Sequence, residues 1–394
     1  MTKFPLEHAP FPPLHLVDSD KEALLNIADI FVTETMEDYE RHLHAHNGIV
    51  DARQWVRVKQ FEDVVVYQDR QALKDRRLSR VNHSRDRNDK NKEMLKLLWS
   101  GTVLGRLDDI MYAAVNRTAE EAKVKAAFVE SNVVDVAVLD TLVHPTVDEP
   151  FRGVQIKWAV NAGPAMMRSV VRYRDFIYME STGMTTLSTG ERVGFQLLHT
   201  ISIPGAAPEL HEHKLVRGNM TLYHVFRQKT ESVVETYVKA FIDLMGDMPL
   251  RVATTLSTTG VVSVWKLSEL ALMKKLNWKL SQRRAIVPGD RGKACSVCGK
   301  TVRGSMVRRR TCKLCVKLCC SHCCVPKKMF CMASYGRAVV EKAANVCKEC
   351  LRVTSHMNGA DLAQSELSKT SARHNAYAYW AAPSPTSSSS SIVL

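Results

Sequence analysis

The sequence predicts an α+β protein in which a large domain built on an antiparallel sheet precedes a small metal-stabilised module. All 11 cysteines lie between Cys295 and Cys350, so the first 294 residues contain none. Before that block, helical periodicity gives way to a long series of strand-like segments and then to an apolar helix. Hydrophobic residues make up 45% of the chain and charged residues 24%, an ordinary globular composition that excludes wholesale disorder and a coiled-coil rod.

The first segment, residues 1–19, is expected to be irregular because four prolines occur by Pro13. Ser19 and Glu22 then have the spacing of a capping box, in which each side chain bonds the backbone of the other. Apolar residues recur at helical spacing after this pair, which predicts a helix over residues 20–44.

Strands and helices are expected to follow in turn. β-Branched and aromatic residues predict strands over 55–58 and 64–67, whereas residues 70–96 are polar and mixed in charge, which predicts an exposed loop. Helical periodicity returns over 107–115 and 120–129. A series of strand-like segments comes next, over residues 134–143, 154–160, 176–180, 193–203, 214–227 and 233–242.

The spacing of these strands, with turns such as the one at Gly183, is typical of an antiparallel meander. After Pro249 the pattern is helical to about residue 280, and its middle is apolar nearly all round, which predicts a buried helix. A curved antiparallel sheet wrapped on one long C-terminal helix would bury all of these apolar faces.

This order of elements resembles the START lipid-binding domain, a helix-grip fold. The similarity is clearest in LVRGNMTL at residues 215–222 and GDMP at 246–249, and it covers residues 20–282. The resemblance implies a hydrophobic tunnel between sheet and C-terminal helix that holds one lipid or sterol, and it implies no catalytic constellation. We therefore expect a non-enzymatic protein, and no motif fixes which residues line the tunnel.

The cysteine block contains four Cys-x-x-Cys pairs. Thiolates are soft donors that suit zinc, and four pairs supply eight ligands, enough for two closed structural sites. The N-terminus lacks the apolar core of a secretory signal, which disfavours disulfides as the alternative. The eight expected ligands are Cys295, Cys298, Cys312, Cys315, Cys320, Cys323, Cys347 and Cys350.

The spacing of the pairs resembles that of the FYVE zinc finger over residues 286–353. That resemblance implies interleaved ligands, with the first and third pairs on one zinc ion and the second and fourth pairs on the other. Three cysteines remain, Cys319, Cys324 and Cys331, and either a register slip or His322 could replace an expected ligand.

The same block is strongly basic. From Lys274 to Arg352 the chain has 20 Lys and Arg against 3 Asp and Glu, whereas the rest of the chain is nearly neutral. Such a block favours phosphate-bearing partners. By the FYVE resemblance, Arg308, Arg309, Arg310 and Lys313 would bind anionic lipid headgroups, phosphatidylinositol 3-phosphate among them. Met306 and Val307 would enter the bilayer.

The FYVE lipid motifs are degenerate here. The family's histidine pair is replaced by Arg310 and Thr311, the Trp-x-x-Asp motif is missing, and Asn345 stands where the family has an arginine. The zinc framework is therefore better matched than the specificity for a 3-phosphate.

Together these features predict a lipid-binding and membrane-targeting adaptor, cytoplasmic and peripheral on endosomal or other phosphoinositide-bearing membranes. No apolar run approaches the ~20 residues of a membrane span. The alternatives are a RING-like protein-interaction module and a basic nucleic-acid-binding finger. The second fits less well because Phe330 and Tyr335 are the only aromatic residues of the finger. Residues 354–394, which end rich in serine and proline, are expected to be a disordered tail, and the sequence leaves the oligomeric state open.

Overall fold

The computed structural model describes residues 3–12, 14–71, 73, 94–203, 205–246, 248, 250–258, 260, 262–283, 293–302, 310–333 and 338–370. Contacts divide the chain into two compact units. Unit 1 comprises residues 1–271 and 358–367, and unit 2 comprises residues 272–357 and 368–394. The division falls upstream of the expected boundary near residue 282. After the cysteine block, the chain returns to unit 1 at Asn358.

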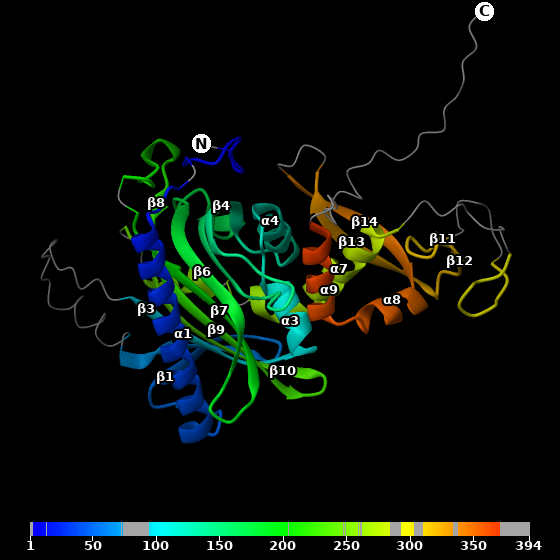
Figure 1. Ribbon diagram of the computed structural model, residues 1–394, viewed down its shortest axis with the longest axis horizontal. Helices are drawn as coiled ribbons and strands as arrows, with labels where there is room; N and C mark the ends of the chain where they lie inside the picture. Colours follow the sequence, from blue (N-terminus) through cyan, green and yellow to red (C-terminus); the bar gives the residue numbers. More distant parts are fainter. Residues whose placement is uncertain are drawn as a thin grey trace, which may run out of the picture. The chain divides into compact units, whose positions relative to one another are not determined.

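Unit 1 is built on a ten-stranded sheet with the strand order β1-β2-β3-β10-β9-β7-β6-β5-β4, in which β8 pairs with β6. Every neighbouring pair is antiparallel except β6 and β8 (Figure 1). The fold class expected from the sequence, α+β with a large antiparallel sheet, is confirmed. The strands are β1 Trp55–Phe61, β2 Val64–Asp69, β3 Leu95–Leu104, β4 Val133–Val143, β5 Gly153–Asn161, β6 Arg174–Thr186, β7 Arg192–Thr200, β8 Val216–Arg217, β9 Asn219–Thr230 and β10 Val233–Asp243.

Strand β3 was not foreseen. Its first residues fall at the end of the stretch expected to be a loop, and its sequence lacks strict alternation because both of its faces are largely buried. β3 pairs with β10 along its whole length, Trp99 lying opposite Val238, and with β2 on its other side. It therefore connects the N-terminal hairpin β1-β2 to the rest of the sheet.

Helix α1, Asp18–His46, packs across β7 and β9 on one face of the sheet. Tyr39 donates a hydrogen bond to Glu235 at 2.6 Å, and Tyr237 donates one to Asp38 at 2.9 Å. The capping box expected at Ser19 is wrong. The helix starts earlier, with Val17 at its N-cap and no side-chain capping bond, and Asp18 and Asp20 in its first turn complement the helix dipole instead.

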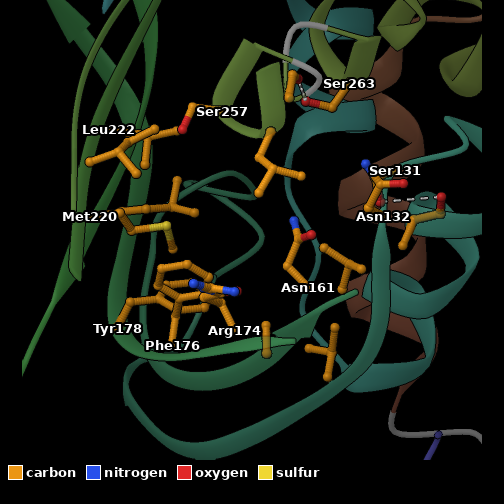
Figure 2. A pocket seen from close by; sticks show the side chains of 18 of the residues that line it. Ser131, Asn132, Asn161, Arg174, Phe176, Tyr178, Met220, Leu222, Ser257 and Ser263 are labelled. Atoms are coloured by element: carbon orange, nitrogen blue, oxygen red, sulfur yellow. Dashed lines mark hydrogen bonds between the residues drawn. The ribbon is translucent and has the colours of Figure 1, made fainter. Parts of the chain in front are cut away.

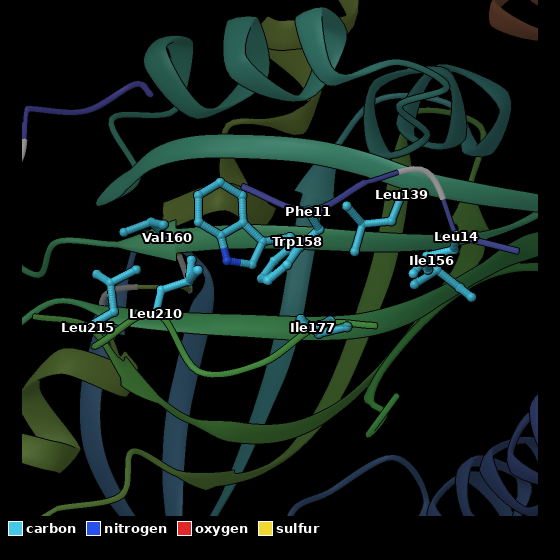
Figure 3. Close-up of a cluster of buried hydrophobic side chains, with 10 residues drawn as sticks. Phe11, Leu14, Leu139, Ile156, Trp158, Val160, Ile177, Leu210 and Leu215 are labelled. Atoms are coloured by element: carbon cyan, nitrogen blue, oxygen red, sulfur yellow. The ribbon is translucent and has the colours of Figure 1, made fainter. Parts of the chain in front are cut away.

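The irregular N-terminal segment belongs to the core of unit 1. Its described residues before Asp18 form no helix or strand, and they cover the same sheet face as α1. Phe11 meets Trp158 edge-on with ring centroids 6.1 Å apart (Figure 3). Side chains that alternate along β5 and β6, among them Ile156 and Ile177, complete this cluster with Leu210 and Leu215.

The opposite face of the sheet carries α3, Leu107–Ala114, and α4, Ala119–Phe128. The single long C-terminal helix expected after Pro249 is wrong in its continuity. The described residues from 250 to 281 form three helices, α5 Leu250–Thr258, α6 Val262–Trp265 and α7 Leu267–Ser281, with Gly260 between the first two. Glycine is a poor helix former. Gly260 also lies against the Trp99 ring. The buried character expected of this segment holds at Val264 and Leu267.

Unit 2 contains the end of α7, two small hairpins and a helix. The hairpins are β11 Arg310–Thr311 with β12 Leu318–Cys319, and β13 Cys324–Met332 with β14 Val339–Cys347. Helix α8, Lys348–Ser355, follows β14 directly. Within the unit, the Asn277 amide donates to the Phe330 carbonyl at 3.0 Å, and Lys275 donates to the Met357 carbonyl at 2.7 Å.

The tail expected to be disordered begins with ordered structure. Helix α9 spans Gly359–Thr370, and residues 371–394 lie outside the described part of the chain. Asn358–Leu367 belongs to unit 1 and docks on α3. Glu366 accepts a hydrogen bond from Tyr112 at 2.6 Å and pairs with Arg117, and the Gly359 amide donates to Asp109 at 3.0 Å. Among the described residues, no helix has the length and apolarity needed to cross a membrane.

Candidate functional sites

Unit 1 contains a partly open cavity of about 270 Å³ between the sheet and its covering helices. The floor is the sheet face opposite α1, because the side chains that line the cavity alternate along β5, β6, β7, β9 and β10. The walls come from α4, the segment after β5, α5 and the residues before α6 (Figure 2). The cavity therefore lies between sheet and C-terminal helices, where the sequence predicted a tunnel, but α5 and α6 cover it rather than one long helix.

Much of the cavity wall is apolar. Figure 2 shows Met220 and Leu222 on the sheet side, facing Asn132 and Asn161 across the hollow, with Phe176 and Tyr178 below. Such a surface favours a ligand with hydrocarbon parts. The apolar residues of the wall include Ala122, Ala126, Val129, Val133, Val136, Ala159, Ala162, Val171, Phe176, Leu198, Met220, Leu222, Ile242, Leu244 and Leu256.

A buried ion pair joins Lys157 of β5 and Glu180 of β6 at one part of the wall. Lys157 also donates to the Asn116 carbonyl at 2.8 Å, and Gln196 donates to Glu180. Burial acts to raise the pKa of Glu180, but the charge and hydrogen bond of Lys157 outweigh it and hold this pKa below its ordinary value. The two charges therefore neutralise each other.

Two polar atoms of cavity-lining residues have no hydrogen-bond partner among the described residues. They are Trp99 Nε1, on β3, and Ser257 Oγ, on α5. The residues are 1% and 8% exposed, so neither atom reaches bulk solvent. Buried polar groups are nearly always satisfied, because an unmade hydrogen bond costs about 1–3 kcal/mol. Both atoms lie beneath the cavity surface, so they mark polar groups within the wall and are not themselves open to the cavity.

The eight expected cysteines form two clusters in unit 2. Cys295, Cys298, Cys320 and Cys323 form one, and the Sγ atoms of each cluster lie within 4.8 Å of one another. The second cluster consists of Cys312, Cys315, Cys347 and Cys350. These are the interleaved sets implied by the FYVE resemblance.

The cluster dimensions fit zinc. Cys298 and Cys320 have Sγ atoms 3.8 Å apart, and Cys315 and Cys347 have theirs 3.9 Å apart. A tetrahedron with Zn–S bonds of about 2.3 Å has S–S edges of roughly 3.8 Å. A hydrogen bond from Cys350, with further ones from backbone amides, lowers the pKa of Cys312 to about 4, which favours the thiolate that a metal requires. All eight positions are sulfur, so both sites would be closed and structural.

The first two Cys-x-x-Cys pairs adopt one turn. In the first, the Cys295 amide donates to the Lys300 carbonyl at 2.8 Å and the Gly299 amide donates back at 2.9 Å. The second repeats this with Cys312, Lys317 and Val316 at 3.1 and 2.9 Å. Gly299 and Val316 occupy the same place, with φ of 71° and 60°. Glycine tolerates that left-handed backbone, whereas valine is strained by it.

The remaining cysteines lie outside both clusters. Cys319 contacts the Lys317 carbonyl at 3.8 Å, Cys331 contacts the Val340 carbonyl at 3.9 Å, and Cys324 is buried at the start of β13. His322 is exposed, with Nε2 3.3 Å from Nζ of Lys348. The structure therefore supports neither alternative considered from the sequence: no shifted set of cysteines comes together among the described residues, and His322 belongs to neither cluster.

The candidate headgroup site is described in part. Arg308, Arg309, Met306 and Val307 lie outside the described residues. Arg310, in β11, and Lys313, next to Cys312, are exposed, and within the described part of the chain neither has an acidic partner. The Lys313 backbone is fixed by a hydrogen bond of its amide to the Asn345 carbonyl at 2.7 Å.

Sequence reasoning missed the polar residues of the cavity. Trp99 lies in the strand that was not foreseen, and Ser257, Lys157 and Glu180 occur in segments whose neighbours carry no recognisable motif. A possible signal was the alternation along β6, where Arg174, Phe176, Tyr178 and Glu180 share one face and line the cavity.

No family model matches the sequence, and no curated protein matches it. Among solved structures, the chain is similar to human STARD10 at 12% identity and a TM-score of 0.39, over 63% of this chain and 82% of that one. It is similar to human StAR-related lipid transfer protein 5 at 15% identity and a TM-score of 0.42, over 64% of this chain and 97% of that one. A third similarity is to the lipid transfer and protein localization domain of human StarD13, at 13% identity and a TM-score of 0.37, over 64% and 98% of the two chains.

Proposed function

We propose that this protein is a non-catalytic lipid-binding adaptor. Unit 1 holds one lipid in its cavity, and the cysteine-rich finger of unit 2, stabilised by two zinc ions, binds an anionic membrane surface. The observation that carries the first part is the cavity of about 270 Å³, whose largely apolar wall also holds a few polar side chains, among them Asn132, Asn161 and Arg174. Apolar walls with a few fixed polar groups are the usual form of a small-molecule site.

The segment between β5 and β6 supports exchange of this lipid with a membrane. Met166 and Val170 are 86% and 84% exposed, although large apolar side chains usually lie inside a protein. Arg168 lies two residues after Met166, and Gly163 and Val171 of the same segment line the cavity beside Asn161 at the end of β5. An apolar tip with basic neighbours suits the interface of an anionic bilayer, and here it adjoins the cavity.

Lipid binding is tested by native mass spectrometry of the purified full chain. We expect one lipid adduct, and we expect it to disappear in Ala159→Phe, because Ala159 lies in the cavity wall and is buried. The control is Ala343→Phe, at an exposed position of β14. A parent protein without adduct, even after incubation with lipid vesicles, would contradict the proposal.

For the finger we propose phosphoinositide binding, with phosphatidylinositol 3-phosphate on endosomal membranes as the first ligand to test. Arg310 is exposed in β11, and Lys313 is exposed on the turn that the second cysteine cluster would hold rigid. Arg308 and Arg309 precede them in the chain. Each basic residue near an anionic surface contributes about 1 kcal/mol, so four give roughly 4 kcal/mol and salt-sensitive binding.

Liposome sedimentation tests the finger. Substituting Arg308, Arg309 and Arg310 together by Ser should release the protein from phosphoinositide vesicles at low salt. The matched control substitutes Lys327, Lys328 and Lys342 of the β13-β14 hairpin, which removes the same charge elsewhere in unit 2. Equal loss in both variants would show that net charge, and not this cluster, binds the membrane. Preference among vesicles with different phosphoinositide isomers decides whether the 3-phosphate matters.

A further inference from the structure

We infer that the lipid held in the cavity carries an anionic group, a phosphate or a carboxylate, which lies against Arg174 and Arg172. The inference rests on the proposed lipid binding of unit 1 and specifies the class of lipid. It follows from the charge of the cavity wall, from the contacts of Arg174, and from the position of both arginines at the start of β6.

The cavity wall is positively charged. Its ionisable side chains of fixed charge are four basic residues, Lys125, Lys157, Arg172 and Arg174, and one acidic residue, Glu180. Glu180 is paired with Lys157. His224, buried behind this wall, adds no charge, because burial lowers its pKa to about 4. Lys125 also acts on Glu180, so the excess positive charge lies at Arg172 and Arg174. An apolar cavity with excess positive charge favours an anionic guest.

Arg174 is the most informative of these residues. It is 8% exposed, and its guanidinium donates to the carbonyls of Leu244, at 3.1 Å, Met245, at 3.3 Å, and Arg172. Among the described residues it has no carboxylate partner. Three carbonyls use three of its five N–H groups and leave its charge uncompensated. Buried charges are normally paired, and burial together with Arg172 lowers the pKa of Arg174, so the charged form is destabilised as it stands.

Arg172 provides a second cation for the same ligand. It lies two residues before Arg174, lines the same cavity and is exposed to solvent. It has no acidic partner in the described part of the chain. One buried and one exposed guanidinium at the edge of a cavity can bind a phosphate or carboxylate that enters from solvent, because the planar fork donates two parallel hydrogen bonds.

The position of Glu180 separates the two ends of the site. Arg174 and Glu180 lie on the same face of β6, six residues and about 20 Å apart along the strand. An anion at the arginine end therefore avoids the negative carboxylate. Phe176 and Tyr178 lie between the two ends and present ring surface to the hydrocarbon part of the ligand (Figure 2).

Arg174 also has a structural explanation, because its bonds to Leu244 and Met245 clamp the turn after β10. A purely structural arginine would affect stability and would leave lipid preference unchanged. Arg172 separates the two roles, because its side chain is exposed and no described contact of that side chain holds the fold.

The experiment measures binding of matched lipids by the delipidated full chain. Oleate and oleyl alcohol differ in a carboxylate against a hydroxyl, and 1-oleoyl lysophosphatidic acid and mono-oleoylglycerol differ in a phosphate against a hydroxyl. Charged hydrogen bonds predict that at least one anionic lipid binds about tenfold tighter than its neutral partner. The lipid pair with the larger ratio of affinities shows whether the site prefers a carboxylate or a phosphate.

Arg172→Gln should reduce that preference several-fold and leave neutral lipids unaffected, and Arg174→Lys should reduce it further if it folds, as judged by circular dichroism. Arg41→Gln, at an exposed position of α1 away from the cavity, is the control. Equal affinities within both lipid pairs, or an unchanged preference in Arg172→Gln, would overturn the inference while lipid binding stood. Failure of every lipid to bind would overturn the proposed function as well.

Discussion

Gly299 and Val316 occupy equivalent turns of the finger, and they show how much strain one backbone angle can add. Gly299 has φ of 71°, and a Cβ added there would meet nothing within 4 Å. Val316 adopts the same conformation with a branched side chain. The left-handed region costs an L-residue about 1–2 kcal/mol, so the two turns differ in strain and not in hydrogen bonding.

We therefore expect Gly299→Val to weaken zinc retention by the first cluster about 5–30-fold, because the strain opposes the metal-bound turn. Zinc transfer to a colorimetric chelator measures this. Val316→Gly is the reciprocal variant and should retain zinc at least as well as the parent. Equal retention in the parent and Gly299→Val would contradict the account of the turn.

His224 gives a second residue-level prediction, on pH. Burial, with Lys125, lowers its pKa from 6.5 to about 4 in the folded protein. Between these values the unfolded chain binds a proton that the folded chain does not, so His224 makes unit 1 less stable as the pH falls from 6.5 to 4. His224→Gln should therefore flatten the fall of the melting temperature of unit 1 between pH 7 and pH 4.5. His144→Gln, at an exposed position, should not; if the two variants melt alike at both pH values, the assignment to His224 fails.

At the scale of elements, the sequence predicted the helices and strands whose apolar residues repeat at a regular spacing. The helix near the N-terminus, α3, α4 and most of the strands occur close to where they were expected, because their apolar residues repeat at 3.6 or 2. β3 was missed because both of its faces are buried, which removes the alternation. The breaks between α5, α6 and α7 were missed because apolar residues continue through them.

Helix α9 could not be read as a docking element, because its fit depends on α3, some 250 residues earlier in the chain. A Cβ at Gly359 would lie 2.4 Å from the Asp108 carbonyl oxygen, so only glycine permits this approach. Glu366 adds the contacts with Tyr112 and Arg117.

Glu366→Ala should loosen α9 by about 1–3 kcal/mol, because it leaves the partly buried Arg117 guanidinium without this partner. Hydrogen exchange of the α9 amides measures the change, and faster exchange is expected. Asp361→Ala, at an exposed position of the same helix, is the control. Exchange that is equally fast in both variants would contradict a special role for Glu366.

For the whole molecule, the metal centres were the most predictable feature and the cavity contents the least. Spacing within the chain predicted the four cysteine pairs, because a Cys-x-x-Cys turn brings its two sulfurs together locally. The FYVE resemblance implied how the pairs combine into two sets, and the structure has those sets. The cavity is formed by residues from distant strands and helices, and the polarity of its wall depends on which side chains the sheet brings to one face.

We expect two zinc ions per chain, and we expect a chelator to unfold unit 2 while unit 1 keeps its cooperative melting transition. Elemental analysis and calorimetry measure the two effects. Cys315→Ser should lose one zinc ion, whereas Cys331→Ser, outside both clusters, should keep two. Metal-free protein whose unit 2 melts as before would show that the cysteine clusters need no ion.

Because Asn358–Leu367 belongs to unit 1, the chain enters unit 2 and then returns to unit 1. The finger is an insertion within unit 1 along the chain, and not an appendage that can be removed by an early stop. A termination codon after Met357 would delete a docked piece of unit 1 as well as everything beyond it. We expect such a truncated protein to melt at a lower temperature in unit 1 itself, whereas excision of residues 284–357 with α9 rejoined by a flexible linker should preserve that temperature.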